Sequence, residues 1–230
     1  FNKGMELYKK EKYGAAQHYF LKFYESHEGI KTELITLAQY YAALCALELS
    51  NGDAEYLVNR FVNENPENPL INKAYFLLAD YAFRRNSYPM VLKYMPLVDR
   101  YYLDQDELSQ YYFQTGYSHY MRKSYPEARV AFYEIKDIDS KYSIPALYYY
   151  SHTAYEEKNY ETSLNGFLRL LDDETFSGVA PYYVTQIYYH QKKYSELVAF
   201  APSLMEKASD NKRSAEISKI VGEAYFYLDR

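Results

Sequence analysis

The sequence predicts an all-α protein built from repeated pairs of helices. Gly and Pro occur only eight times each in 230 residues, which is too few turn formers for a fold of many short strands. Small and aromatic residues recur together every 34 to 38 residues, and within each recurrence the apolar positions follow a helical period. Apolar residues make up 48% of the chain, so a disordered protein is excluded.

Each repeat is recognised by a small anchor residue, and the anchors lie at positions 4, 42, 79, 116, 151, 185 and 222. After Gly4, for example, come Leu7, Tyr13, Ala16 and Phe20, and the later units place the same kinds of residue at the same offsets. Two positions depart from the pattern: Asn51 stands where the other units have Tyr, and Thr185 replaces a smaller anchor.

Every unit is expected to fold as two helices joined by a short polar turn. Apolar or small residues around the anchor form one helical face, and the second helix begins near the recurrent Tyr, where Pro89 and Pro126 suit a first helical turn. The six expected units span residues 1–34, 35–71, 72–108, 109–144, 145–178 and 179–215, and residues 216–230 form the first helix of a seventh. That last helix would expose Tyr225 or Leu228, so we expect the natural protein to continue.

The order of small residue, aromatic residue, Tyr-x-x-Ala and large apolar residue resembles the tetratricopeptide repeat over essentially all of the chain. The resemblance implies a right-handed α–α superhelix of about 13 antiparallel helices, in which each repeat packs on its neighbours. It also implies that the first helices line a concave groove that holds a protein or peptide. Most spacings exceed the 34 residues typical of the family, which we assign to longer loops.

Aromatic residues are concentrated at the positions that face the groove in the resembled family. Each of the seven first helices has three such positions, and Phe and Tyr fill 12 of the 21. Two interpretations remain open: the rings form an exposed interaction surface, or they pack against one another and narrow the groove. The candidate partner-binding residues are Phe76, Phe83, Phe113, Tyr117, Tyr120, Tyr148, His152, Tyr155, Tyr182 and Tyr189.

The sequence offers no catalytic, metal or cofactor motif. It contains no phosphate-binding glycine loop, no nucleophile elbow and no pair of His residues spaced with a Glu as in zinc enzymes. The single cysteine, Cys45, falls on the expected core stripe and is predicted to be an inert buried thiol. The net charge of −5 and the absence of basic runs disfavour nucleic-acid binding, and no apolar stretch is long enough for a transmembrane segment.

These features predict a non-catalytic scaffold that binds a protein or peptide segment in an aromatic groove. The pair of Lys and Asn with which chaperone adaptors of the family hold a terminal carboxylate is missing. Glycan binding in the cell envelope and a sensor or regulatory module of a larger protein are the alternatives, and an enzyme ranks after both. The Tyr-, Asn- and Lys-rich composition favours a bacterial protein of the periplasm or outer membrane.

Overall fold

The structure is a computed structural model that describes residues 1–27, 29–207 and 211–229. Within these ranges the chain forms thirteen α-helices and two short 3-10 helices, and no β-strand. The predicted all-α class and number of helices are therefore confirmed. No helix in the described ranges has both the length and the apolar character needed to cross a bilayer.

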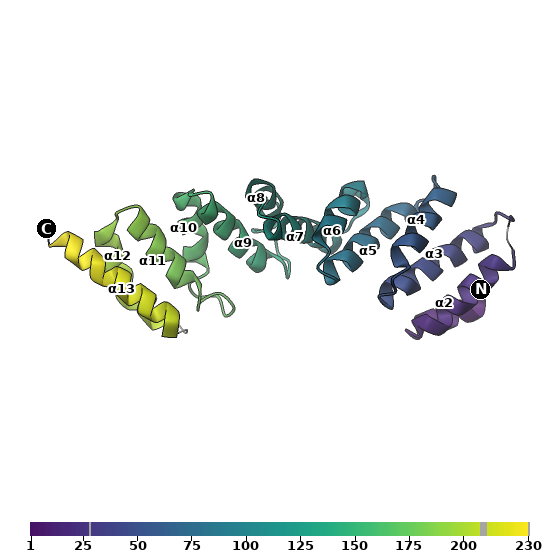
Figure 1. Ribbon diagram of the computed structural model, residues 1–230, viewed down its shortest axis with the longest axis horizontal. Helices are drawn as coiled ribbons and strands as arrows, with labels where there is room; N and C mark the ends of the chain where they lie inside the picture. The colour runs from purple at the N-terminus through teal and green to yellow at the C-terminus, as the bar shows by residue number, and fades with distance from the viewer. Residues whose placement is uncertain (28, 208–210, 230) are drawn as a thin grey trace. The chain divides into compact units, whose positions relative to one another are not determined.

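The chain divides into two compact units, Phe1–Ser118 and His119–Arg230 (Figure 1). Unit 1 contains α1 (Asn2–Lys9), α2 (Tyr13–Glu25), α3 (Glu33–Glu48), α4 (Ala54–Glu64), α5 (Leu70–Arg84), α6 (Tyr88–Tyr94), η1 (Met95–Leu97) and η2 (Arg100–Tyr102). Helix α7 (Gln105–Met121) begins in unit 1 and ends in unit 2. Unit 2 continues with α8 (Tyr125–Tyr133), α9 (Ser143–Glu156), α10 (Tyr160–Arg169), α11 (Ala180–His190), α12 (Tyr194–Lys207) and α13 (Asn211–Leu228).

Six helices end in the same backbone motif: α1, α3, α5, α7, α9 and α11. Each is followed by a residue with φ between 55° and 60°, and these residues are Glu11, Ser50, Asn86, Lys123, Lys158 and Lys192. The next N–H returns to the carbonyl five residues earlier, at 2.8 to 3.0 Å in all six cases, as in Lys12 to Leu7 and Asn159 to Ala154. This Schellman-type cap ends each first helix and directs the chain into the second.

The caps explain why Asn51 departs from the sequence pattern. In the other units the left-handed residue lies seven positions after the anchor, as Glu11 does after Gly4, but Ser50 lies eight positions after Ala42. The cap therefore lies next to Asn51, and α4 begins only at Ala54. Ala54 is fully buried, so the small residue of the second helix keeps its place in the core.

Small residues lie where two helices approach closely. A Cβ on Gly4 would come within 2.7 Å of the Phe20 ring, and a Cβ on Gly166 within 1.8 Å of Ser151 Oγ, so neither position has room for a side chain. The anchors Ser151 and Thr185 are fully buried, and each hydroxyl donates to the carbonyl four residues earlier, at 2.7 and 2.8 Å. Thr185 is therefore accommodated without an unsatisfied polar atom.

A stacked pair of aromatic rings recurs between one second helix and the following first helix. Phe20 stacks on Tyr41 at 5.5 Å, Phe132 on Tyr149 at 5.5 Å, and Phe167 on Tyr183 at 4.5 Å between ring centroids. All three Phe rings are fully buried. Each contributes about 1.5–3 kcal/mol by burial, and each ring pair adds about 0.5–1.5 kcal/mol.

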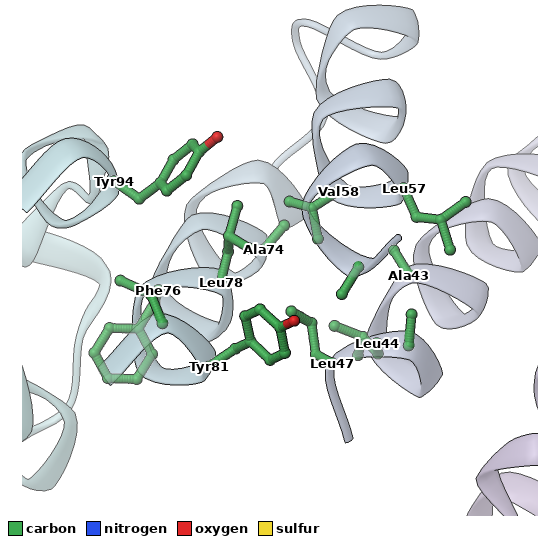
Figure 2. Packing of buried hydrophobic residues seen from close by; sticks show 14 of the residues in the cluster. Ala43, Leu44, Leu47, Leu57, Val58, Ala74, Phe76, Leu78, Tyr81 and Tyr94 are labelled. Atoms are coloured by element: carbon green, nitrogen blue, oxygen red, sulfur yellow. The ribbon is translucent and has the colours of Figure 1, made fainter. Parts of the chain in front are cut away.

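Figure 2 shows the main core of unit 1, where Leu47 of α3, Val58 of α4 and Leu78 of α5 converge. Cys45 is buried as predicted, and burial raises the pKa of its thiol to about 12, so the thiol is un-ionised at neutral pH. On α13, Tyr225 and Leu228 are 52% and 43% exposed, which agrees with the expectation for that helix.

Candidate functional site

The ten candidate residues lie on first helices of both units, and none of them is fully exposed. Unit 1 contains Phe76 and Phe83 on α5 and Phe113 and Tyr117 on α7. Unit 2 contains Tyr120 at the end of α7, Tyr148, His152 and Tyr155 on α9, and Tyr182 and Tyr189 on α11. Nine are partly buried and one, Phe76, is buried, so packing between rings accounts for much of the aromatic enrichment.

Phe76 corrects the expectation of a groove-facing ring. It is 3% exposed and belongs to the main core of unit 1, where Figure 2 shows it beside Leu78 and Tyr81. The Lys73 ammonium lies 5.3 Å from its ring centroid. A side chain buried to this degree offers no surface to a partner. The sequence position did not reveal this because a helix that is apolar all round has no face that pattern alone can assign to solvent.

The other three candidates of unit 1 form one cluster with Tyr88. Phe83 meets Tyr117 edge-on at 5.6 Å, Tyr117 stacks on Phe113 at 6.0 Å, and Tyr88 lies 5.9 Å from Tyr117. These tilted and offset arrangements are the favourable ones for aromatic rings. The cluster therefore joins α5, α6 and α7.

A charged side chain, Asp80, lies between Phe76 and Phe83 on α5. Its Oδ1 accepts hydrogen bonds from the side-chain amides of Gln110 and Gln114 at 2.6 and 2.7 Å, and its Oδ2 lies 3.1 Å from Arg84 Nε. Gln114 is 3% exposed. The carboxylate is thus engaged by donors from its own helix and from α7, and it holds these two helices together.

His152 lies at the centre of the aromatic cluster in unit 2. Its ring centroid is 5.5 Å from Tyr120, 6.1 Å from Tyr148, 6.4 Å from Tyr155 and 5.2 Å from Tyr183. Nδ1 is 3.3 Å from the Tyr120 hydroxyl, and Nε2 is 3.8 Å from a carboxylate oxygen of Glu156.

Burial sets the charge of this cluster. It lowers the pKa of His152, with Glu156 opposing, and it raises the pKa of Tyr155 to about 12. Burial also raises the pKa of Tyr148, although a hydrogen bond with Tyr183 acts in the opposite direction. At neutral pH the imidazole is therefore uncharged and the hydroxyls stay protonated, so the cluster offers neutral donors and acceptors.

The ring contacts continue along α11 to α13. His190 stacks on Tyr160 at 5.5 Å, Tyr189 lies 5.9 Å from Tyr194, and Tyr194 stacks on Tyr227 at 4.9 Å. The Tyr189 hydroxyl donates to Glu223 at 2.7 Å. The candidates of unit 2 therefore belong to one continuous set of rings that joins four first helices.

Tyr183 is a residue of this set that the sequence interpretation missed. It contacts His152, Tyr155 and Phe167. The missed signal is its position two residues before the anchor Thr185, which Tyr149 repeats before Ser151. Both rings stack on the Phe of the preceding second helix.

The surroundings of His152 are mainly aromatic. His152 has a hydroxyl and a carboxylate nearby, but its side chain is only 12% exposed and is surrounded by aromatic rings. Among the described residues, no group of three His, Cys, Asp or Glu side chains is placed to hold a metal ion. No known protein-family model matches the chain, and no curated protein matches it significantly.

Proposed function

We propose that this chain is a non-catalytic protein-interaction module of the tetratricopeptide type, an α-solenoid that holds a segment of a partner protein against the aromatic face of unit 2. We define this face by Tyr148, His152, Tyr155, Tyr182, Tyr183 and Tyr189. The observation that carries the proposal is the continuous set of partly exposed rings on α9 and α11, fixed by ring contacts and hydrogen bonds on their buried sides.

The repeated caps support the solenoid part of the proposal. Their left-handed residues lie 34 to 39 residues apart, and each precedes a second helix. In addition, first helices contact first helices of the next pair, as α3 does α5 and α11 does α13. Such nearest-neighbour packing is typical of repeat proteins whose first helices share one binding surface.

The fixed geometry of the rings supports the binding part. Tyr155 is held between Tyr160 and Tyr183, at 6.0 and 5.3 Å, so little side-chain freedom remains to be lost when a partner docks. Tyrosine supplies a broad apolar contact and a hydroxyl that can reach backbone groups of the partner. Because the rings and the imidazole are neutral, we expect a partner segment that binds through apolar side chains and backbone hydrogen bonds.

Selection of a peptide library displayed on phage against the intact chain tests this proposal. We expect enriched peptides whose affinity falls about tenfold or more in the variant Tyr155→Ala/Tyr182→Ala, which corresponds to a loss of about 1.4 kcal/mol or more from the removed aromatic contacts. Tyr133→Ala is the matched control, because Tyr133 is 59% exposed on α8 and lies outside the face. Circular dichroism checks that both variants keep their helices. Peptides that bind both variants as they bind the wild type would refute the aromatic face.

A further inference from the structure

The Asn- and Pro-rich loop that joins α4 to α5 lines three adjoining cavities at one edge of unit 1. We number these cavities along the loop, from Tyr24 to Tyr102. The first, of about 580 Å³, lies between this loop and the start of α3, and the second and third measure about 400 Å³ each. Lys31 and residues 64–66 border both the first and the second of these, and Asn68 and Pro69 border both the second and the third. The three cavities therefore form one continuous depression over the loop.

The wall of the first cavity is fixed by a hydrogen-bond network around Glu64. Its carboxylate accepts from the Tyr24 hydroxyl at 2.8 Å, the Gln39 amide at 2.9 Å and Arg60 Nε at 3.1 Å. Asn65 donates to Gln39 Oε1 at 2.9 Å. Burial alone would raise the pKa of Glu64, but the three donors lower it overall, so the carboxylate stays charged and engaged.

Side-chain hydrogen bonds also fix the wall of the third cavity, which includes the exposed ring of Tyr102. The Asn72 side chain makes two hydrogen bonds with the backbone of Asp99, one donated to its carbonyl at 3.1 Å and one accepted from its N–H at 2.6 Å. These bonds position the 3-10 segment that presents Tyr102, which is 71% exposed at the cavity wall. Lys73 and Glu107 of this wall form an ion pair, and the Asp99 carboxylate accepts a hydrogen bond from the Tyr101 backbone N–H.

The residues that line the cavities are suited to binding a polyhydroxylated ligand. Five carboxamide side chains line the cavities: Gln39, Asn63, Asn65, Asn68 and Asn72. A carboxamide carries two N–H donors and an oxygen with two lone pairs, so Gln39 and Asn72, which each use one donor and one acceptor position within the protein, can still bond a sugar hydroxyl. Tyr102 adds a flat apolar ring for the C–H face of a sugar. Glu64 pairs with Arg60 and Lys73 with Glu107, and the other charged lining residues, Lys31, Glu67 and Asp99, are of mixed sign, so the lining has no cluster of like charge for an ionic ligand. Each of the three cavities lies within the usual range of small-molecule sites, about 300–1,000 Å³.

We propose that this depression, which we call the loop cavity, binds a neutral oligosaccharide. Its successive rings would lie along the loop from Tyr24 to Tyr102. The two prolines Pro66 and Pro69 restrict the loop backbone, so the site is formed before the ligand arrives. This site lies wholly in unit 1, and the proposal is independent of the partner-binding face in unit 2.

Titration calorimetry on the intact chain tests the proposal. The probes are neutral oligosaccharides of two to four units built from α- and β-linked glucose, mannose, galactose, xylose and N-acetylhexosamine, each at up to about 10 mM, which detects millimolar dissociation constants. We expect at least one of these probes to bind saturably to the wild type.

Two pairs of variants locate the binding. Tyr102→Ala should weaken it about tenfold, as should Glu64→Gln, because each removes a contact or disturbs a hydrogen bond of the site. Tyr101→Ala is the control for the first, since Tyr101 is 86% exposed beside Tyr102 but does not line the cavity. Glu55→Gln is the control for the second, because Glu55 also lies on α4 and also binds a Tyr and a basic residue, Tyr94 and Lys93.

The outcomes are decisive in either direction. Saturable binding that both test variants weaken and both controls retain supports the loop cavity as a carbohydrate site. Absence of binding to every probe overturns the proposal, and so does binding that Tyr102→Ala and Glu64→Gln leave unchanged.

Discussion

Units 1 and 2 fill the same repeat position in two chemically different ways. Asp80 and His152 each follow their anchor by one residue. Asp80 is held by Gln110, Gln114 and Arg84, whereas His152 is enclosed by tyrosine rings. The first solution depends on directional bonds to a charge, and the second on ring packing around a neutral group. The helix-pair framework therefore tolerates either chemistry at this position.

The largest expected effect concerns the ring stack of Phe167 in unit 2, because one repeat of unit 1 has the non-aromatic Met95 at the same position. Phe167→Ala should lower the free energy of unfolding by about 3–5 kcal/mol, because a fully buried ring and its stack on Tyr183 are lost. Met95 occupies the same repeat position in unit 1 and is also fully buried. Urea unfolding of Met95→Ala should show a smaller loss, and an equal loss would mean that the stack adds nothing to burial.

The close helix crossing comes next. Gly166→Ala should cost about 1–3 kcal/mol, because the new Cβ would overlap Ser151 Oγ and force α9 and α10 apart. The double variant Gly166→Ala/Ser151→Gly should recover much of the lost stability, because the Ser151 side chain that the new Cβ would overlap is then absent. Thermal unfolding measures this recovery. Gly14→Ala is the control, because a Cβ there meets no atom within 4 Å. A double variant no more stable than Gly166→Ala would contradict this account.

The polar link of unit 1 should have a comparable or smaller effect. Asp80→Ala leaves two glutamine amides without their acceptor, one of them on the nearly buried Gln114, and should cost about 1–3 kcal/mol. Asp80→Asn keeps an acceptor oxygen and should cost less. Hydrogen exchange should show the loss of protection in α5 and the first turns of α7 within unit 1, and a loss in α9 or α11 would be inconsistent with it.

The smallest effect concerns pH. Because burial lowers the pKa of His152 in the folded state, the unfolded chain binds the proton more readily. The stability contributed by the neutral imidazole is therefore present above the unfolded pKa of about 6.5 and falls as the pH drops below it. Tm measured from pH 8 to about pH 5 should fall less in His152→Gln than in the wild type. The Tm of His152→Gln should still depend on pH, because burial also lowers the pKa of His119. An identical pH profile would rule out this role for His152.

Most of the helical framework could be predicted from sequence because it rests on short-range regularities. The small anchors, the recurrent Tyr and the first-turn prolines locate both helices of each pair, since their constraints are local. The left-handed caps were not visible in the sequence, because Glu, Ser and Lys occupy positions where Gly is the usual signal.

The candidate site was harder to predict for a physical reason. Spacing places Phe76 and Tyr155 on the same helical face, but only the neighbouring helices decide that Phe76 is buried and Tyr155 partly exposed. Tyr183 was missed because its ring reaches the preceding pair of helices. The loop cavity had no periodic signal, since its wall joins residues from three loops and helix ends.

The six left-handed caps also mean that the chain is built below its own stability optimum. A side chain at such a φ costs about 1–2 kcal/mol relative to glycine, and the chain bears this cost in Glu11, Ser50, Lys123, Lys158 and Lys192, with a smaller cost at Asn86. Because the caps are far apart, changes at them should be nearly additive. Glycine substitutions at these caps should therefore raise the free energy of unfolding step by step, without changing the core, the aromatic face or the loop cavity.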